Sequence, residues 1–392
     1  MLGRILGRSK QLAGKSGGDK QAELKIGLVA CKTGLLANYG LPALQGFELG
    51  IEYATQGRWQ VAGRPIRLLV EDDAGDPALG EAKAQALVEQ EGVHLLQACT
   101  SSGVSIKLAR VAQEKKRLLM VAVAATGVLT GEWFNRYIFR TAANTFQDAA
   151  AGGKYAAEHL GKTFYFFSPD YIWGQQSRSA WWKVIEQYGG QIVGDTLVSP
   201  DEQDFRPYLY DVLAKRPDVL VPAWVGNAVT RLFLQMEEVG LLGQVKIAGN
   251  LVDRENILAA GKAMAGLTCA VKYHPDFPKN EVNAWLVARH QAKFGAPPDV
   301  FTESGFTSAL ALMRALTQTE GDPDPERLIP ALEGMRFDGP KGVYTLRAED
   351  HQALQPMYIA ELVVPPGEAY CVPRLIAEVS AKETTPPLVK PR

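Results

Sequence analysis

Hydroxyl side chains follow one apolar run of the sequence and open a helical stretch. Ser101 and Ser102 come just after the run Val93–Cys99 and stand before Gly103. Free backbone N–H groups at a helix start carry a partial positive charge, and serine hydroxyls beside them add hydrogen-bond donors. Such a turn can hold a carboxylate without lysine or arginine, although a serine in this place can equally serve only as the helix cap. We predict an anion-binding turn at these serines.

A second turn of small residues follows the next apolar run, Leu118–Ala122. It contains Ala124, Ala125 and Thr126. Small side chains let a ligand approach the backbone, and the threonine hydroxyl is a further donor. An ordinary small-residue turn has the same sequence pattern, so position in the fold must decide between the two interpretations.

Aromatic residues occupy other turns of the same kind. Tyr171 and Trp224 each follow an apolar run in the middle of the chain, and Tyr39 stands near a helix start in the loop after the first run. An aromatic residue on a loop is often a core residue, but two separate strand ends with Tyr or Trp favour a wall that packs an apolar or aromatic ligand.

Short apolar runs alternate with amphipathic helical stretches from Lys25 onward, which is typical of βαβ units on a parallel sheet. We predict an α/β fold of two doubly wound parallel-sheet lobes, joined by a hinge of three crossovers. The carboxyl ends of both sheets would then face one cleft, where the turns described above meet and which hinge closure would seal.

The predicted strands and helices define a division of the chain. Helical windows at 280–294 and 302–319 are expected to return to the first lobe, and strands at 342–346 and 357–363 to the second. The expected parts are an N-terminal tail 1–24, lobe 1 at 25–143 plus 271–341, lobe 2 at 144–270 plus 342–376, and a C-terminal tail 377–392.

Composition and charge limit the classes of protein. The chain has 392 residues, of which 46% are hydrophobic and 22% charged, which suits two or three domains or two lobes of one binding module. Its 42 Lys+Arg nearly balance its 43 Asp+Glu, so no general field attracts nucleic acid or an anionic membrane. No apolar stretch reaches the roughly 18 residues needed to span a bilayer.

Residues for catalysis or for cofactor binding are not grouped in the sequence. The 5 histidines are scattered without an HExxH motif, and neither a phosphate-binding GxxxxGK[ST] loop nor a GxGxxG fingerprint occurs. We therefore predict no catalytic residues, no metal and no cofactor.

Cysteines and the N-terminal residues bear on the compartment. Cys31 and Cys99 each end an apolar run, so a disulfide between neighbouring strand ends stays open beside buried free thiols. Residues 1–24 lack the apolar core of a secretory signal, and we expect them to lie outside the fold. Either the true leader is missing, or the protein resides in the cytoplasm.

Several segments together resemble the branched-chain amino-acid-binding family of ABC-transporter receptors, which are periplasmic binding proteins of the first fold type. The resemblance covers residues 25 to about 365 and is carried by "KIGLVACKTGLLANYGLPALQGFELGIEYA", "ACTSSGVSIKLARVAQEKKRLLMVAVAATGVLTG", "SPDYIWGQQ" and "RAEDHQALQPMYIAEL". It implies that the serine and alanine–threonine turns hold a ligand carboxylate and that Tyr39, Tyr171 and Trp224 form the ligand wall. It also implies a monomeric, periplasmic or cell-envelope receptor that delivers its ligand to an ABC permease.

One departure from the family pattern concerns the ligand's ammonium group. Members that bind amino acids usually place an acid after the last strand of the second lobe, whereas this chain has Asn250 there and Asp253 as the nearest acid. A buried ammonium without a partner is unfavourable. An apolar amino acid and an aromatic carboxylate therefore both remain open as ligands, and a cytoplasmic amide or amino-acid sensor of the same fold is the alternative function.

Overall fold

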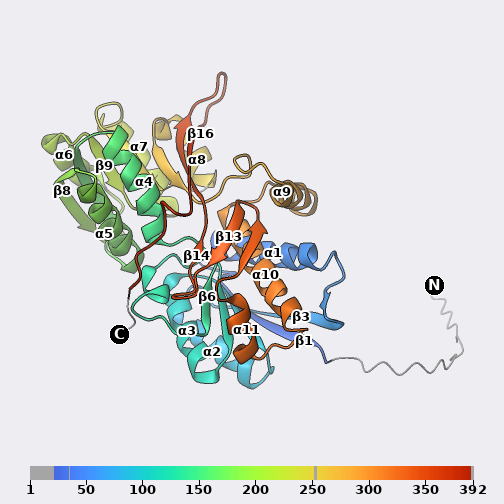
Figure 1. Ribbon diagram of the computed structural model, residues 1–392. Helices are drawn as coiled ribbons and strands as arrows, with labels where there is room; N and C mark the ends of the chain where they lie inside the picture. Colours follow the sequence, from blue (N-terminus) through green and yellow to red (C-terminus); the bar gives the residue numbers. More distant parts are fainter. Residues whose placement is uncertain (1–21, 35, 251–253, 390–392) are drawn as a thin grey trace, which may run out of the picture.

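The first of two open sheets is formed by the N-terminal third of the chain. The computed structural model describes residues 22–34, 36–250 and 254–389 (Figure 1). The strands of this sheet lie in the order β2-β3-β1-β4-β5-β6. Their bounds are β1 (Leu24–Ala30), β2 (Gln60–Val61), β3 (Arg64–Asp72), β4 (Leu95–Cys99), β5 (Leu118–Val121) and β6 (Ile138–Arg140). All of them pair in parallel except the short β2, which forms a hairpin with β3.

The second sheet repeats this arrangement with the middle of the chain. Its order is β16-β15-β11-β10-β9-β7-β8, and only the two late strands β15 and β16 run antiparallel to their neighbours. The bounds are β7 (Thr163–Pro169), β8 (Gln191–Val198), β9 (Val219–Pro222), β10 (Lys246–Asn250), β11 (Thr268–Val271), β15 (Met357–Val363) and β16 (Val372–Val379). The predicted α/β fold with two doubly wound, mostly parallel sheets is confirmed.

Helices cover both faces of each sheet, as Figure 1 shows. Those of the first sheet are α1 (Ala37–Ala54), α2 (Pro77–Glu89), α3 (Ser102–Lys115), α9 (Glu281–Phe294), α10 (Val300–Gln318) and α11 (Pro325–Leu332). Those of the second are α4 (Thr145–His159), α5 (Ile172–Gln187), α6 (Arg206–Lys215), α7 (Asn227–Glu238) and α8 (Arg254–Ala260). The predicted return of residues 280–294 and 302–319 to the first sheet is confirmed by the helices α9 and α10, which pack there against α1.

Small residues allow α1 and α10 to touch through their backbones. A Cβ atom at Gly46 would lie 1.9 Å from the carbonyl oxygen of Thr302, and one at Gly305 would lie 2.0 Å from that of Ala43. Both distances are far below van der Waals contact. Glycine at these two positions is therefore what permits the helices to pack so closely.

The central strands of the second sheet are apolar on both sides because both sides are covered. Along β7, Phe164 and Phe166 pack in one buried cluster with Trp181, while Tyr165 and Phe167 pack in another. Strands buried on both faces have continuous apolar runs instead of alternating ones. This is why these strands could be located from hydrophobicity alone.

Buried amide groups tie the crossovers between the two sheets. The side-chain N–H of Gln355 donates to the carbonyl oxygen of Thr141 at 2.8 Å, and that of Gln352 donates to Ala142 at 2.9 Å. Asn144 in turn donates to the oxygen of the Gln352 side chain at 3.3 Å. Both glutamines are buried. These bonds therefore hold the segment before β15, which is one crossover, against the segment that joins β6 to α4, which is another.

The prediction that residues 342–346 return to the second sheet is wrong. They form β13 (Gly342–Leu346), which pairs with β12 (Arg336–Gly339) and β14 (Ala353–Leu354) in a separate small sheet. Its Tyr344 and Leu346 pack into the core of the first sheet. The apolar spacing located the strand, but its neighbour depends on the β12–β13 turn, which holds the strand beside its hairpin partner.

The predicted tails are too long at their inner ends. Leu24 is the first residue of β1 and is fully buried, and residues 377–379 belong to β16. Beyond that strand, the hydroxyl of Thr384 donates to the carbonyl oxygen of Gln355 at 3.3 Å, and Arg347 donates to that of Pro386 at 2.8 Å. The segment up to residue 389 is therefore held by the crossover region. Residues 1–21 and 390–392 lie outside the described residues.

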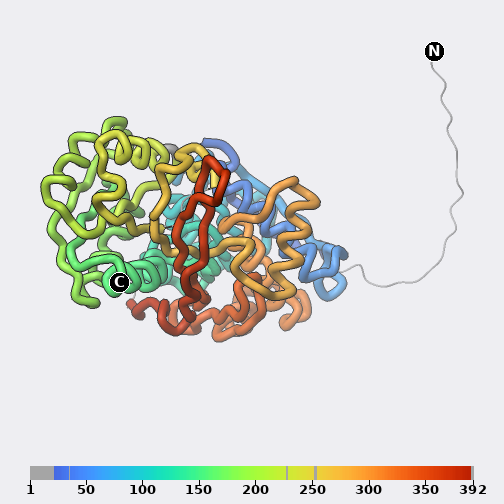
Figure 2. The backbone as a smooth tube through the Cα atoms, turned by 90° about the horizontal axis from the view of Figure 1, so that it is seen from above, coloured from blue at the N-terminus to red at the C-terminus, as the bar shows by residue number. Residues whose placement is uncertain are grey.

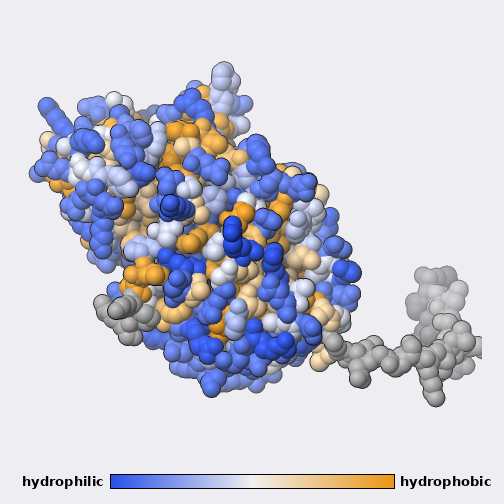
Figure 3. Space-filling model, viewed as in Figure 1, coloured by the Kyte–Doolittle hydropathy of each residue, from blue (hydrophilic) through white to orange (hydrophobic). Residues whose placement is uncertain are grey.

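The β15–β16 hairpin lies across the middle of the molecule, as Figure 2 shows. Its outer strand leaves Leu375 43% exposed and Ile376 41% exposed. Most of the face seen in Figure 3 is hydrophilic, with apolar side chains gathered toward the middle. Within the described ranges, no helix is long and apolar enough to cross a membrane.

Candidate functional site

Both sheets reverse their strand order beside the predicted turns. In the first sheet the order changes between β1 and β4, and in the second between β7 and β9. Ligands of open α/β sheets bind at the carboxyl ends of strands, at this point of reversal. Tyr39 and Ser101 follow β1 and β4, and Tyr171 and Trp224 follow β7 and β9, so these four residues flank the two reversal points.

The two serines after β4 have different roles. Ser101 caps α3, because its hydroxyl accepts a hydrogen bond from the backbone N–H of Val104 at 3.2 Å. Ser102 is the first residue of the helix and is half-buried, and its hydroxyl makes no hydrogen bond to any described residue. The capping interpretation thus accounts for Ser101, while the hydroxyl of Ser102 is available to a ligand.

The turn after β5 is buried and bonded on both sides. Ala124, Ala125 and Thr126 are all less than a tenth exposed. The carbonyl oxygen of Ala125 accepts from the backbone N–H of Thr145 at 3.0 Å. The hydroxyl of Thr126 donates to the side-chain oxygen of Gln176 at 2.6 Å, and Gln176 belongs to α5 of the second sheet. This hydrogen bond brings the predicted anion turn against the second half of the molecule.

A buried arginine supports this turn from behind. The guanidinium of Arg140 is fully buried and donates to the carbonyl oxygen of Thr126, to the hydroxyl of Thr130 and, at 2.7 Å, to the side-chain oxygen of Gln352. All three acceptors are neutral. Burial lowers the pKa of Arg140 to about 9, and the nearby carboxylate of Asp350 opposes this shift. The turn therefore has a positive charge behind it, and a bound anion would stabilise that charge.

Two of the predicted wall residues lie at helix starts. Tyr39 is half-buried in the first turn of α1, where its ring stacks on Phe301 with centroids 4.1 Å apart. Tyr171 is the N-cap residue of α5 and lies 6.1 Å from Trp173, and its side chain makes no capping hydrogen bond. Burial raises the pKa of the Tyr171 hydroxyl well above its usual range. The start of α5 thus presents two aromatic rings.

Trp224 is more deeply buried than the other wall residues. It is 6% exposed, with its ring 4.7 Å from that of Phe205 and 5.4 Å from that of Phe167. Its indole N–H is buried without a hydrogen-bond partner among the described residues. An unpaired buried donor is unfavourable, so this N–H is a place where a polar atom of a ligand would be stabilised.

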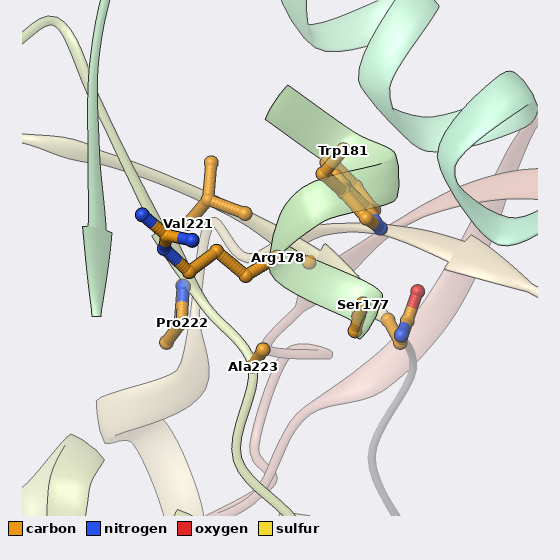
Figure 4. A pocket seen from close by; sticks show the side chains of 8 residues that line it. Ser177, Arg178, Trp181, Val221, Pro222 and Ala223 are labelled. Atoms are coloured by element: carbon orange, nitrogen blue, oxygen red, sulfur yellow. The ribbon is translucent and has the colours of Figure 1, made fainter. Parts of the chain in front are cut away.

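Asn250, the last residue of β10, lines a small cavity beneath the turns of the second sheet. Figure 4 shows Ser177, Arg178 and Trp181 reaching this cavity from α5. The side-chain oxygen of Asn250 is buried and has no partner among the described residues. The enclosed space measures only about 10 Å³, about the room of one water molecule, so this cavity by itself is too small to hold a whole ligand. Asp253 lies outside the described residues.

Cys31 and Cys99 are neighbours at the reversal point but carry free thiols. The backbone N–H of Cys31 donates to the carbonyl oxygen of Cys99 at 3.3 Å, and both side chains are buried. Burial raises the pKa of Cys31 to about 11 and that of Cys99 to about 12. Protonated, buried thiols of this kind are unreactive packing groups. In the part of the chain that the structure describes, no three His, Cys, Asp or Glu side chains are grouped to hold a metal.

Two doubly wound sheets, with polar turns on one and aromatic turns on the other, define a two-sheet protein that binds a small ligand. The chain belongs to the periplasmic binding protein family, whose pattern it matches over residues 23–368. It is 26% identical to the Leu/Ile/Val-binding protein homolog 4 of Brucella melitensis over 371 residues, 90% of this chain and 86% of that protein.

Solved structures agree with this family. A crystal structure of an ABC-type branched-chain amino acid transporter from Rhodopseudomonas palustris CGA009 is 32% identical, covers 94% of this chain and 100% of its own, and superimposes with a TM-score of 0.82. An ABC-transporter solute-binding protein from Rhodopseudomonas palustris BisB5, solved with 3,4-dihydroxybenzoic acid, is 26% identical, with 92% and 98% coverage and a TM-score of 0.82. The chain is thus a solute-binding protein of an ABC transporter, in a family of proteins that are not enzymes.

Sequence reasoning missed two residues of the site. Gln176 stands within the quoted "SPDYIWGQQ" segment, but its contact with Thr126 depends on how the two sheets lie against each other. Arg140 ends the apolar strand β6, and a charged residue that ends a buried strand is the signal that could have identified it. Burial of its guanidinium behind Thr126 is a property of the folded chain.

Proposed function

We propose that this protein captures a small apolar carboxylate between its two sheets and delivers it to the membrane permease of an ABC importer. It acts as a monomer in the periplasm or cell envelope. The turns after β4 and β5 hold the carboxylate, and the aromatic turns of the second sheet pack the apolar body of the ligand.

The buried turn at Thr126 is the main observation that supports carboxylate binding. Its backbone and hydroxyl groups lie in front of the Arg140 guanidinium, whose hydrogen bonds all go to neutral acceptors. A buried cation without a carboxylate in direct contact is stabilised when an anion binds nearby. The unbonded hydroxyl of Ser102, at the positive end of α3, supplies a second donor in the same region.

An aromatic carboxylate is the ligand class that we favour. The β10 strand ends in the neutral Asn250, and the start of α5 carries Tyr171 and Trp173. An aromatic acid needs ring contacts but no partner for an ammonium group. The relative from Rhodopseudomonas palustris BisB5 was solved with such an acid.

A branched-chain amino acid is the second candidate. The names of the Brucella relative and of the 32% identical structure favour it. In that case an acidic side chain must pair with the ligand's ammonium, and Asp253 is the nearest one in sequence. The similarity to these transport proteins favours importer function over the amide or amino-acid sensor.

A melting panel tests the function and separates the candidates. The panel contains benzoate, 3,4-dihydroxybenzoate, leucine, valine, benzamide and urea. A ligand at about a thousand times its Kd adds roughly 4 kcal/mol to the free energy of unfolding, which raises Tm by several degrees. We expect a shift with the aromatic acids, whereas a shift with leucine and valine alone would favour the second candidate.

Neutral compounds serve as the control in this panel. Benzamide matches benzoate in shape but lacks its charge, so it should leave Tm unchanged if the site selects an anion. A response to benzamide or urea without any response to the carboxylates would contradict the proposed function and revive the sensor.

A further inference from the structure

Gln176, a side chain of helix α5, accepts hydrogen bonds from the donors of the anion turn. The side-chain oxygen of Gln176 accepts the hydroxyl hydrogen of Thr126 at 2.6 Å and the backbone N–H of Gly127 at 3.2 Å. Thr126 is fully buried and Gln176 is half-buried. The contact joins residues on the two different sheets at the site proposed for the ligand.

The orientation of the Gln176 amide follows from its partners. A backbone N–H can only donate, so the atom facing Gly127 must be the amide oxygen. The amide nitrogen then points away from both donors, and it makes no hydrogen bond to any described residue. The oxygen of Gln176 thus accepts both hydrogen bonds from the turn, while its two amide N–H groups bond to no described residue.

This arrangement changes the role of Thr126. A threonine hydroxyl has a single hydrogen to donate, and Thr126 donates it to Gln176. While that bond lasts, the hydroxyl cannot also donate to a ligand carboxylate. The amide nitrogen of Gln176 can do so instead, and α5 adds a favourable field because its N-cap residue Tyr171 leaves the first turn without a side-chain cap.

We propose that Gln176 is a ligand-contacting residue that determines specificity for carboxylates. Its amide N–H donates to the ligand carboxylate, while its oxygen stays on Thr126 and Gly127. Thr126 is then a positioning residue that acts through Gln176. This inference rests on the proposed function, because it assigns a donor to the same carboxylate.

Three substitutions test this role by calorimetric titration of the full chain with benzoate and with leucine. Gln176→Leu removes both the acceptor and the donors, and we expect about tenfold weaker binding, the loss typical of one hydrogen bond to a charged group. Gln176→Glu keeps acceptors for Thr126 and Gly127 but places a negative charge at the ligand carboxylate, so binding should weaken more than in Gln176→Leu. Gln175→Leu is the matched control.

The control residue lies one position away and bonds elsewhere. Gln175 is exposed, and its amide donates to Asp170 at 2.5 Å, so its substitution should leave affinity unchanged. Gln176→Leu leaves the buried Thr126 hydroxyl and the Gly127 N–H without their acceptor, so its unliganded melting temperature should be lower than that of the wild type. Gln176→Glu keeps that acceptor and Gln175 is exposed, so the unliganded melting temperatures of Gln176→Glu and Gln175→Leu should match the wild type.

A double substitution separates the roles of the two residues. If Thr126 acts through Gln176, adding Thr126→Ala to Gln176→Leu should weaken binding no further, whereas adding Ser102→Ala should weaken it again. Wild-type binding that Gln176→Leu leaves unchanged, or tightens by removing a competing acceptor, would overturn this inference and leave the proposed function standing. Absence of wild-type binding to every carboxylate of the panel would overturn both.

Discussion

The turns of the first sheet and those of the second share one topology but differ in chemistry. Both sets of turns follow the carboxyl ends of strands that lie at a reversal of strand order or, as for β5, directly beside one. In the first sheet the turn at Thr126 is small, buried and fixed by hydrogen bonds that include the Arg140 guanidinium. In the second, Trp224 is fixed by ring packing, and its one polar group has no partner among the described residues.

This difference shows how one fold can recognise two ends of one ligand. A turn held by hydrogen bonds presents donors at fixed positions, which suits a charged group that needs directional partners. A turn held by aromatic packing presents a broad apolar surface, which suits the apolar body of a ligand. The predictions below test whether the two regions depend on these two kinds of force.

Removing the buried ring of Trp224 should have the largest effect. Trp224→Ala leaves a cavity against Phe167 and Phe205, and large-to-small changes of this kind lower the free energy of unfolding by about 3–5 kcal/mol. Chemical denaturation measures the loss. Trp133→Ala is the control, because Trp133 is 46% exposed and should change stability by less than about 1 kcal/mol. Equal losses in both variants would remove the packing argument for the second region.

The crossover region should respond to pH through Lys341, a buried lysine of the β12–β13 turn whose ammonium donates to the side-chain oxygen of Gln355. Burial lowers the pKa of its ammonium to about 8 from the ordinary 10.5, and the charge of Glu303 opposes this shift. From pH 8 to 10.5 the unfolded chain holds this proton while the folded chain has lost it, so the free energy of unfolding rises with pH across this window. Below pH 8 both states hold the proton, and stability stays at its lower level.

A comparison of variants isolates this effect from other titrating groups. The stability of the wild type relative to Lys341→Met, measured by denaturation, should increase by about 2–3 kcal/mol between pH 7 and pH 10. The buried thiols titrate equally in both proteins and cancel in the difference. A difference that does not change with pH would show that the Lys341 ammonium is not destabilised by burial.

Loss of a hydroxyl in the first region should weaken binding but leave the fold intact. Ser102→Ala and Thr126→Ala should each reduce the affinity for a carboxylate by about 1–3 kcal/mol, through one lost hydrogen bond in the chain of contacts to the anion. Titration calorimetry measures the change. If neither substitution alters affinity, the carboxylate is not held at these turns.

The smallest expected effect separates the two neighbouring serines. Ser101 caps α3 through the N–H of Val104, so Ser101→Ala should lower the free energy of unfolding by about 1 kcal/mol. Ser102 makes no such bond to a described residue, so Ser102→Ala should leave stability unchanged while it weakens binding. The reverse pattern would exchange the roles that we assign to the two hydroxyls.

Hydrophobic runs and turn residues sufficed to predict both sheets and the elements that carry the site. The apolar run of the buried strand β7 reveals that strand in the sequence, and Ser101 marks the start of α3 by its capping preference. Order along the chain then places the turns at or beside the two reversal points. Local patterns therefore predicted the fold and the positions of the candidate residues.

Contacts between distant segments could not be predicted in this way. The bond between Thr126 and Gln176 spans 50 positions and depends on how the two sheets lie together. The partners of β13 and the docking of Thr384 against Gln355 depend on the same kind of tertiary contact. Such contacts leave no periodic signal in the sequence, because each involves single residues on separate elements.

A crystal structure of the protein with the carboxylate that raises its Tm most is the most direct test of the division between the two regions. We predict that the ligand carboxylate lies between the Ser102 turn and the Thr126 turn, with Gln176 donating to it, and that its apolar body lies against the aromatic turns of the second sheet. A ligand bound in the opposite direction, with its carboxylate at Asn250 and Trp224, would contradict this assignment.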